Sequence, residues 1–375
     1  MIIPPPPPRL TNVNDKKSVR NSNLELYRII VMLLIVAHHY VVNSGLIQHI
    51  QESPDIVNSG VMLLFGAWGK TGINCFVLIT GYFMCKSRFT IEKLIKLYLQ
   101  VAFYGVIIYG IFCFSGHEIV SPLKLIWTLW PVKSISSGFV SCFLLFYLFI
   151  PVLNTLVEHL GKDLHKYLVI LIVVAFSMLP SIAKLHMTFN YVTWFMALYM
   201  ISSYIRLYGI FPKISHAMWG VLALFTLAVG SLSILGLGII YELGYTDTFA
   251  PYFFVADSNK FLSLAIAVSS FMYFKDLKIP YSRFINTVGA ATFGVLLIHA
   301  NSDAMRQWLW RETVDCVGHF GDSVPWTLGY AIVSVLTIFI ICAGIDWLRG
   351  RYIEPKLTSY INGLIFKKWP QLQFK

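Results

Sequence analysis

Two ionisable side chains, Arg28 and His39, lie on the first apolar segment of the chain. A helix turns by about 100° per residue, so their spacing puts both side chains on one helix face, about 16 Å apart along the axis. An ionisable group within such a segment is costly and usually functional, and an imidazole can transfer a proton, attack as a nucleophile or bind a metal. We therefore take Arg28 and His39 as candidate catalytic residues. The alternative for His39 is a hydrogen bond between helices.

The residues around this pair predict supporting roles. His38 points about 100° away from His39, and a hydrogen bond to another helix is its favoured role. Glu25 precedes Arg28 by one helix turn, which predicts a local ion pair. Ser22 and Glu25 have the spacing of a capping box, which predicts that the helix starts there. The chain has no HxxxH or HExxH spacing, so we expect no metal site.

The composition is typical of a membrane protein. Of the 375 residues, 57% are hydrophobic and 13% are charged, about half the charged share of a soluble domain. Apolar segments recur at close to the ~20 residues that cross a bilayer, which predicts an all-α, polytopic helical bundle. We predict about ten transmembrane helices, over residues 24–42, 67–85, 91–114, 136–157, 166–184, 190–208, 214–238, 258–275, 285–302 and 325–348.

The basic residues predict how these helices are oriented. With the N-terminus in the cytoplasm, 22 of the 29 lysines and arginines lie on the cytoplasmic side, as the positive-inside rule requires. An even number of spans then places both termini in the cytoplasm. This asymmetry explains the net charge of +11, so the lipid bilayer is an expected partner and nucleic acid is not. The remaining seven cations are Lys70, Lys124, Lys133, Lys184, Lys260, Arg306 and Arg311.

The chain divides into three predicted parts. Residues 1–22 form a cytoplasmic tail that is rich in proline and basic residues. Residues 23–350 form one membrane domain, and residues 351–375 form a short cytoplasmic tail.

A second group of cations surrounds the predicted cytoplasmic turn after residue 85. Lys93 and Lys96 share a helix face there, and Arg88 precedes them. One reading is that these residues anchor the topology. The other is a phosphate site for a cytoplasmic polyanion such as coenzyme A, at the same membrane face as Arg28.

Several of these segments resemble one known family. The run Asn23-Leu-Glu-Leu-Tyr-Arg28, followed by ten residues and His39, resembles the first helix of the acyltransferase-3 family of integral-membrane O-acyltransferases. Residues 75–83 resemble its second span, with Thr80 where serine is commoner. Trp194-Phe195 and the run that ends at His299 resemble its sixth span and a late span.

The resemblance implies an activity and a set of site residues. It implies transfer of an acyl group, most often acetyl, from acetyl-CoA to a hydroxyl of a surface, exported or lipid-linked polysaccharide, at a bacterial inner membrane. His39 would remove the hydroxyl proton or carry the acyl group itself, and Arg28 would bind a phosphate group of coenzyme A or orient its thioester end. The cofactor-binding candidates are Arg28, Arg88, Lys93 and Lys96, and the acceptor-side candidates are His299 and Trp194.

Two points qualify this implication. Lys93 and Lys96 stand where the family often has arginine, and lysine cannot form bidentate contacts to phosphate. A proton-coupled transporter of a small polar solute is the alternative function, because transporters also bury histidines on proton pathways.

Overall fold

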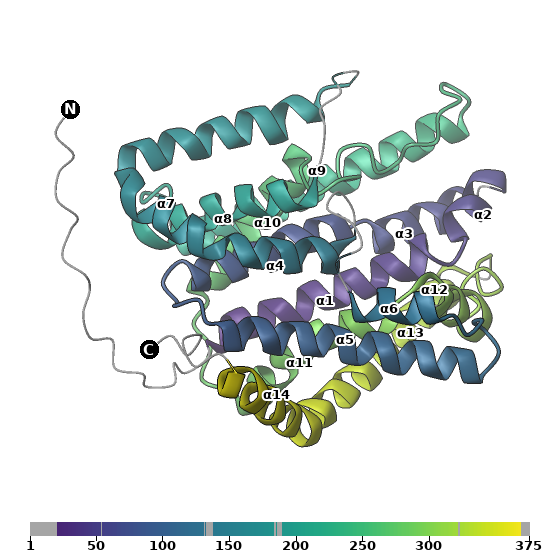
Figure 1. Cartoon of the computed structure of the whole chain (residues 1–375). Coiled ribbons are helices and arrows are strands. Elements are labelled where there is room, and N and C mark those ends of the chain that lie inside the picture. The colour runs from purple at the N-terminus through teal and green to yellow at the C-terminus, as the bar shows by residue number, and fades with distance from the viewer. Residues whose placement is uncertain are drawn as a thin grey trace.

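The protein is a bundle of α-helices (Figure 1). The computed structural model describes residues 21–53, 55–130, 132, 138–183, 185, 190–321 and 323–368, and no strand occurs among them. Outside this part of the chain lie residues 1–20 of the predicted tail over residues 1–22, Lys133, Lys184 and residues 369–375. The helices are α1 (Ser22–Val42), α2 (Leu46–Glu52), α3 (Ile56–Gly66), α4 (Gly69–Met84), α5 (Ile91–Phe114), α6 (Pro122–Leu129), α7 (Phe139–Val173), α8 (Tyr191–Tyr208), α9 (His216–Glu242), α10 (Phe261–Asp276), α11 (Arg283–His299), α12 (Asp303–Gln307), α13 (Val324–Leu348) and α14 (Glu354–Lys368).

Six helical segments in the described part of the chain are long and apolar enough to cross a membrane. A seventh is obtained if α11 and the segment Asp303–Thr313, which bend by 96° at the break between them, count as one span. This confirms a multi-pass helical membrane protein. Each of the ten predicted ranges overlaps a helix, but the number of ten spans and the side of each terminus stay predictions.

The second predicted span is longer than residues 67–85. Helices α3 and α4 together form one apolar segment of 29 residues, Ile56–Met84. Lys70 lies in the middle of this segment rather than at its edge.

Helix α7 contains a break that replaces a predicted loop. The sequence predicts two helices, over residues 136–157 and 166–184, and α7 consists of two helices that meet at Gly161 rather than being joined by a loop of several residues. Gly161 has φ 66° and ψ 168°, a backbone conformation that only glycine adopts at little cost. Gly161 is therefore the single non-helical residue at which the first helix of α7 ends and the second begins.

Helix α1 runs through the middle of the bundle and packs against α3, α4, α11 and α13 (Figure 1). Glycines allow its close approach to α3 and α4, as is usual between membrane helices. A Cβ atom at Gly66 would lie 2.5 Å from Val41, and one at Gly69 would lie 2.3 Å from the ring of His38. These contacts fix the position of His38 and His39 relative to α4.

The predicted capping box at the start of α1 is wrong. Asn21 occupies the N-cap position, and no side chain caps the helix. Ser22 instead donates a hydrogen bond to Asn286 of α11 (3.1 Å) and accepts one from the main-chain amide of Ser282 (2.9 Å). The serine therefore joins α1 to α11 rather than closing its own helix turn.

The C-terminal tail folds back as helix α14 and packs against α5. Glu354, its first residue, forms ion pairs with Lys96 (2.5 Å) and Arg349 (2.7 Å). Arg349 also donates to Asp346, which accepts further hydrogen bonds from the side chains of Tyr104 and Gln100. This buried network ties the end of α13 to α5.

Candidate active site

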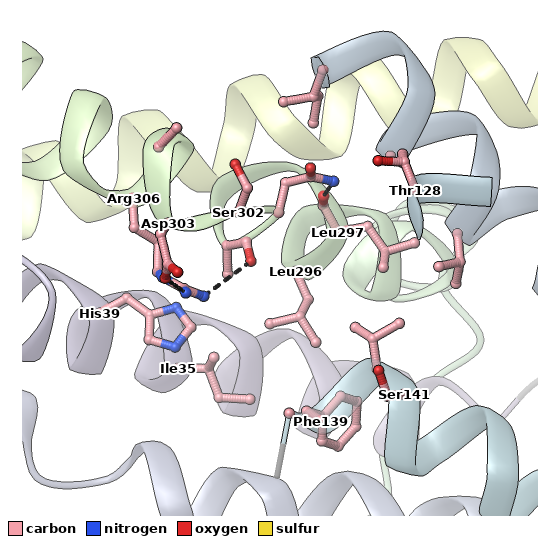
Figure 2. A pocket seen from close by; sticks show the side chains of 18 of the residues that line it. Ile35, His39, Thr128, Phe139, Ser141, Leu296, Leu297, Ser302, Asp303 and Arg306 are labelled. Atoms are coloured by element: carbon pink, nitrogen blue, oxygen red, sulfur yellow. Dashed lines mark hydrogen bonds and ion pairs between the residues drawn. The ribbon is translucent and has the colours of Figure 1, made fainter. Parts of the chain in front are cut away.

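A cavity of about 600 Å³ lies beside α1, between α4, α5, α6, α7 and the end of α11 (Figure 2). Its wall follows α1 from Met32 to His39, and its polar end is formed by the segments that follow α5 and α11. The cavity therefore reaches from the inside of the bundle toward the end at which α1 terminates.

His39 is held in the wall of this cavity by His299. The Nδ1 atom of His39 lies 2.9 Å from Nε2 of His299, and the two ring centroids are 5.0 Å apart. His299 is the last residue of α11 and is completely buried. Its Nδ1 atom lies 2.6 Å from the main-chain carbonyl oxygen of Val295, one turn earlier in the same helix.

These contacts determine where the protons of the two rings lie. The carbonyl of Val295 can only accept, so Nδ1 of His299 carries the hydrogen and its Nε2 atom is an acceptor. His39 must then donate from its own Nδ1 atom, which leaves its Nε2 atom with a lone pair. Two neutral histidines arranged in this way present one basic nitrogen at the cavity wall.

His38 has the structural role that its position predicts. Its Nδ1 atom lies 2.5 Å from the main-chain oxygen of Gly66 in α3, so it forms the expected hydrogen bond between helices. Its ring also contributes to the cavity wall.

Arg28 lies outside the cavity wall, toward the start of α1. Its guanidinium donates to Glu25 (2.8 Å), which confirms the predicted local ion pair, and it lies 6.0 Å from the ring centre of Phe83 in α4. The nearest cavity residue on the same helix, Met32, is one turn away. Arg28 is therefore about one helix turn from the end of the cavity at Met32, but its side chain does not line the cavity.

Three of the predicted phosphate-binding residues, Arg88, Lys93 and Lys96, follow Phe83 in the chain, and the two lysines have partners. Lys96 pairs with Glu354, and Lys93 donates to the main-chain oxygen of Arg88 (2.9 Å). All three side chains are exposed. Their role in binding a cofactor stays a prediction.

The two acceptor-side candidates do not form the cavity wall. His299 lies behind His39. Trp194 is 2% exposed and donates from its indole nitrogen to Asn74 (2.9 Å), which itself donates to the carbonyl oxygen of Ser258. Asp303 follows His299 by four residues but belongs to the next helix, α12, because α11 ends at His299.

The structure adds charged residues to the candidate site, among them three cations that the charge distribution places on the side opposite the cytoplasm. Lys70, Lys124 and Arg306 all contribute to the cavity wall, together with Glu118 and Asp303. One signal was available for Lys70, since it interrupts an apolar segment and an intramembrane charge indicates function.

The part of the chain that the structure describes contains no group of three or more His, Cys, Asp or Glu side chains placed to hold a metal ion. The cavity wall itself offers an imidazole, neighbouring cations and hydroxyl groups.

The fold and the cavity define a multi-pass helical membrane protein with a basic histidine inside the bundle. Residues 21–345 match the acyltransferase domain family. This match covers most of the chain, and the protein belongs to the acyltransferase-3 family. No curated protein and no solved structure shows a significant match to the chain.

Proposed function

We propose that the protein is a membrane O-acyltransferase that moves an acyl group, acetyl in the simplest case, from acyl-CoA to a hydroxyl of a polysaccharide or its lipid-linked precursor. The observation that carries this proposal is the histidine pair. A hydrogen-bonded partner that fixes the tautomer of a cavity histidine is a feature of a general base.

The proposed reaction uses the Nε2 atom of His39. It removes the proton of the acceptor hydroxyl while the hydroxyl oxygen attacks the thioester carbonyl. The carbon–sulfur bond then breaks, the new ester leaves with the acceptor, and His39 returns the proton to the thiolate of coenzyme A. The alternative role, in which His39 carries the acyl group, uses the same lone pair as a nucleophile.

The two substrates would enter from opposite ends of the bundle. Arg28, Arg88, Lys93 and Lys96 lie toward the end where α1 begins, which the charge distribution predicts to be cytoplasmic. Coenzyme A bound there could extend its thioester past Met32 to His39. The acceptor would enter by the polar end of the cavity, which then faces away from the cytoplasm across a bacterial inner membrane.

The test is turnover of radiolabelled acetyl-CoA by the purified protein in lipid nanodiscs, with envelope glycans of the host as acceptor. We expect His39→Ala to lower the rate by about 10²–10⁴-fold, the usual contribution of a general base. His159→Ala is the matched control, because His159 is exposed and bonds only to its own helix, at Thr155.

The outcomes separate the alternatives. Wild-type turnover in His39→Ala would contradict the proposal. Label that stays on acid-quenched wild-type protein, together with ping-pong kinetics, would favour His39 as an acyl carrier. A protein that neither binds nor consumes acetyl-CoA, but moves protons with a polar solute across vesicles, would support the transporter alternative.

A further inference from the structure

The charged residues of the cavity wall do not balance. There are three cations and two carboxylates, a formal surplus of 3 − 2 = +1. Lys124 pairs with Glu118, and Arg306 pairs with Asp303. Lys70 is the cation left over: within residues 21–53, 55–130, 132, 138–183, 185, 190–321 and 323–368, no carboxylate lies within ion-pair distance of its ammonium group.

The partner that Lys70 does have is neutral. Its Nζ atom donates to the hydroxyl of Tyr191, the first residue of α8, at 2.8 Å, and lies 5.5 Å from the centre of that ring. A phenol hydroxyl accepts one hydrogen bond and leaves the positive charge uncompensated. The ammonium group has two further hydrogens to donate.

Lys70 is placed where such a charge is costly. It lies in the middle of the apolar segment Ile56–Met84, in a part of the chain where a lysine without an anionic partner is rarely retained for stability. A bound anion supplied by a substrate would remove this cost.

Lys70 also lies beside the histidine pair. The preceding residue, Gly69, packs directly on the ring of His38, and Lys70, His38 and His39 all line the same cavity. An anion on Lys70 and a hydroxyl on His39 would therefore belong to one small molecule or to neighbouring sugar units.

We propose that the acceptor is an acidic glycan, whose carboxylate or phosphate group binds Lys70 while a nearby hydroxyl lies at Nε2 of His39. This inference rests on the proposed acyltransferase function. The acceptor, rather than coenzyme A, supplies the anion because Lys70 lies in the cavity with Arg306 and Lys124, whereas Arg88, Lys93 and Lys96 lie beyond its wall.

The experiment measures binding first, because binding does not require turnover. The probes are a tetrasaccharide of alternating glucuronic acid and N-acetylglucosamine, a neutral N-acetylglucosamine tetramer, and N-acetylglucosamine 6-phosphate. Wild-type protein in nanodiscs should bind the carboxylate or the phosphate probe about 10–100-fold more tightly than the neutral tetramer, the effect of one charge-assisted hydrogen bond. Added salt should weaken this preference.

The variants are Lys70→Met, which keeps a long, unbranched side chain but removes its charge, and Lys70→Arg, which keeps the charge. We expect Lys70→Met to lose the preference for acidic probes and Lys70→Arg to retain most of it. With acetyl-CoA present, Lys70→Met should raise the KM for the acidic acceptor and leave the KM for acetyl-CoA unchanged. Which of the two acidic probes binds identifies the anion.

Three results would overturn the inference. They are equal binding of neutral and acidic probes by the wild type, an unchanged preference in Lys70→Met, and a change confined to the KM for acyl-CoA. The last would place the anion on the donor, for instance as a terminal carboxylate of the acyl group. Preferred binding of an acidic probe without consumption of acetyl-CoA would instead support the anion site and reject the proposed acyltransferase function.

Discussion

Replacing His299 by alanine is expected to slow acyl transfer without abolishing it. The substitution leaves the His39 ring in place but removes the acceptor for its Nδ1 hydrogen. The ring is then free to place its hydrogen on Nε2 instead, and in that tautomer the nitrogen that should remove a proton already carries one.

The size of the effect follows from the contact that is lost. A buried donor left without a partner costs about 1–3 kcal/mol, and each 1.36 kcal/mol is a factor of about ten in an equilibrium. The productive tautomer should therefore be depleted about 5–150-fold. This is a smaller loss than the removal of the base itself in His39→Ala, about 10²–10⁴-fold.

The assay is the initial rate of acetyl-CoA consumption at saturating acceptor, with folding checked by gel filtration and thermal unfolding. His299→Gln is the informative companion, because its amide oxygen can accept from His39 and its NH2 group can donate to the carbonyl of Val295. The rates should fall in the order wild type, His299→Gln, His299→Ala, His39→Ala. Equal rates for wild type and a folded His299→Ala would refute the tautomer argument.

Two further substitutions test how the helices are held together. Gly69→Ala should lower the free energy of unfolding by about 1–3 kcal/mol and lower the rate of acyl transfer, because the new methyl group overlaps the ring of His38. The control is Gly236→Ala, which has open space around the new methyl group and should keep the unfolding temperature and the rate near those of the wild type. Asp346→Ala should lower the free energy of unfolding by about 3–5 kcal/mol, because the buried Arg349 loses one of its two carboxylate partners. The measurement is thermal unfolding of both proteins in one detergent. An unfolding temperature close to that of the wild type would show that this network contributes little.

The sequence predicted the fold class and most helices because each apolar segment carries its own signal. Helix boundaries were less predictable where that signal is interrupted. The second span was predicted over residues 67–85, but the preceding residues from Ile56 continue the same helical segment. Two helices were predicted over residues 136–157 and 166–184, but the sequence pattern did not show that a single residue with positive φ, Gly161, separates the two helices of α7.

The site was predictable only as separate residues. His39 and the Glu25–Arg28 ion pair follow from spacing within one helix, and the ion pair is confirmed. The contact between His39 and His299 joins residues 260 positions apart and depends on how α1 packs against α11, which no local pattern contains. Lys70 was assigned to the outer surface because charge counting cannot distinguish an anchor from a residue inside a cavity.

The fixed hydrogen bond between the two histidines limits how protons can move during catalysis. His299 has its only hydrogen bound to a main-chain oxygen, so it offers no route by which a proton could leave the site. In the proposed reaction, the nitrogen that takes the acceptor's proton then delivers the same proton to the departing sulfur. Acceptor oxygen and thioester sulfur must therefore both come within hydrogen-bonding reach of Nε2 of His39, and transfer of a neutral acyl group would be indifferent to the membrane potential.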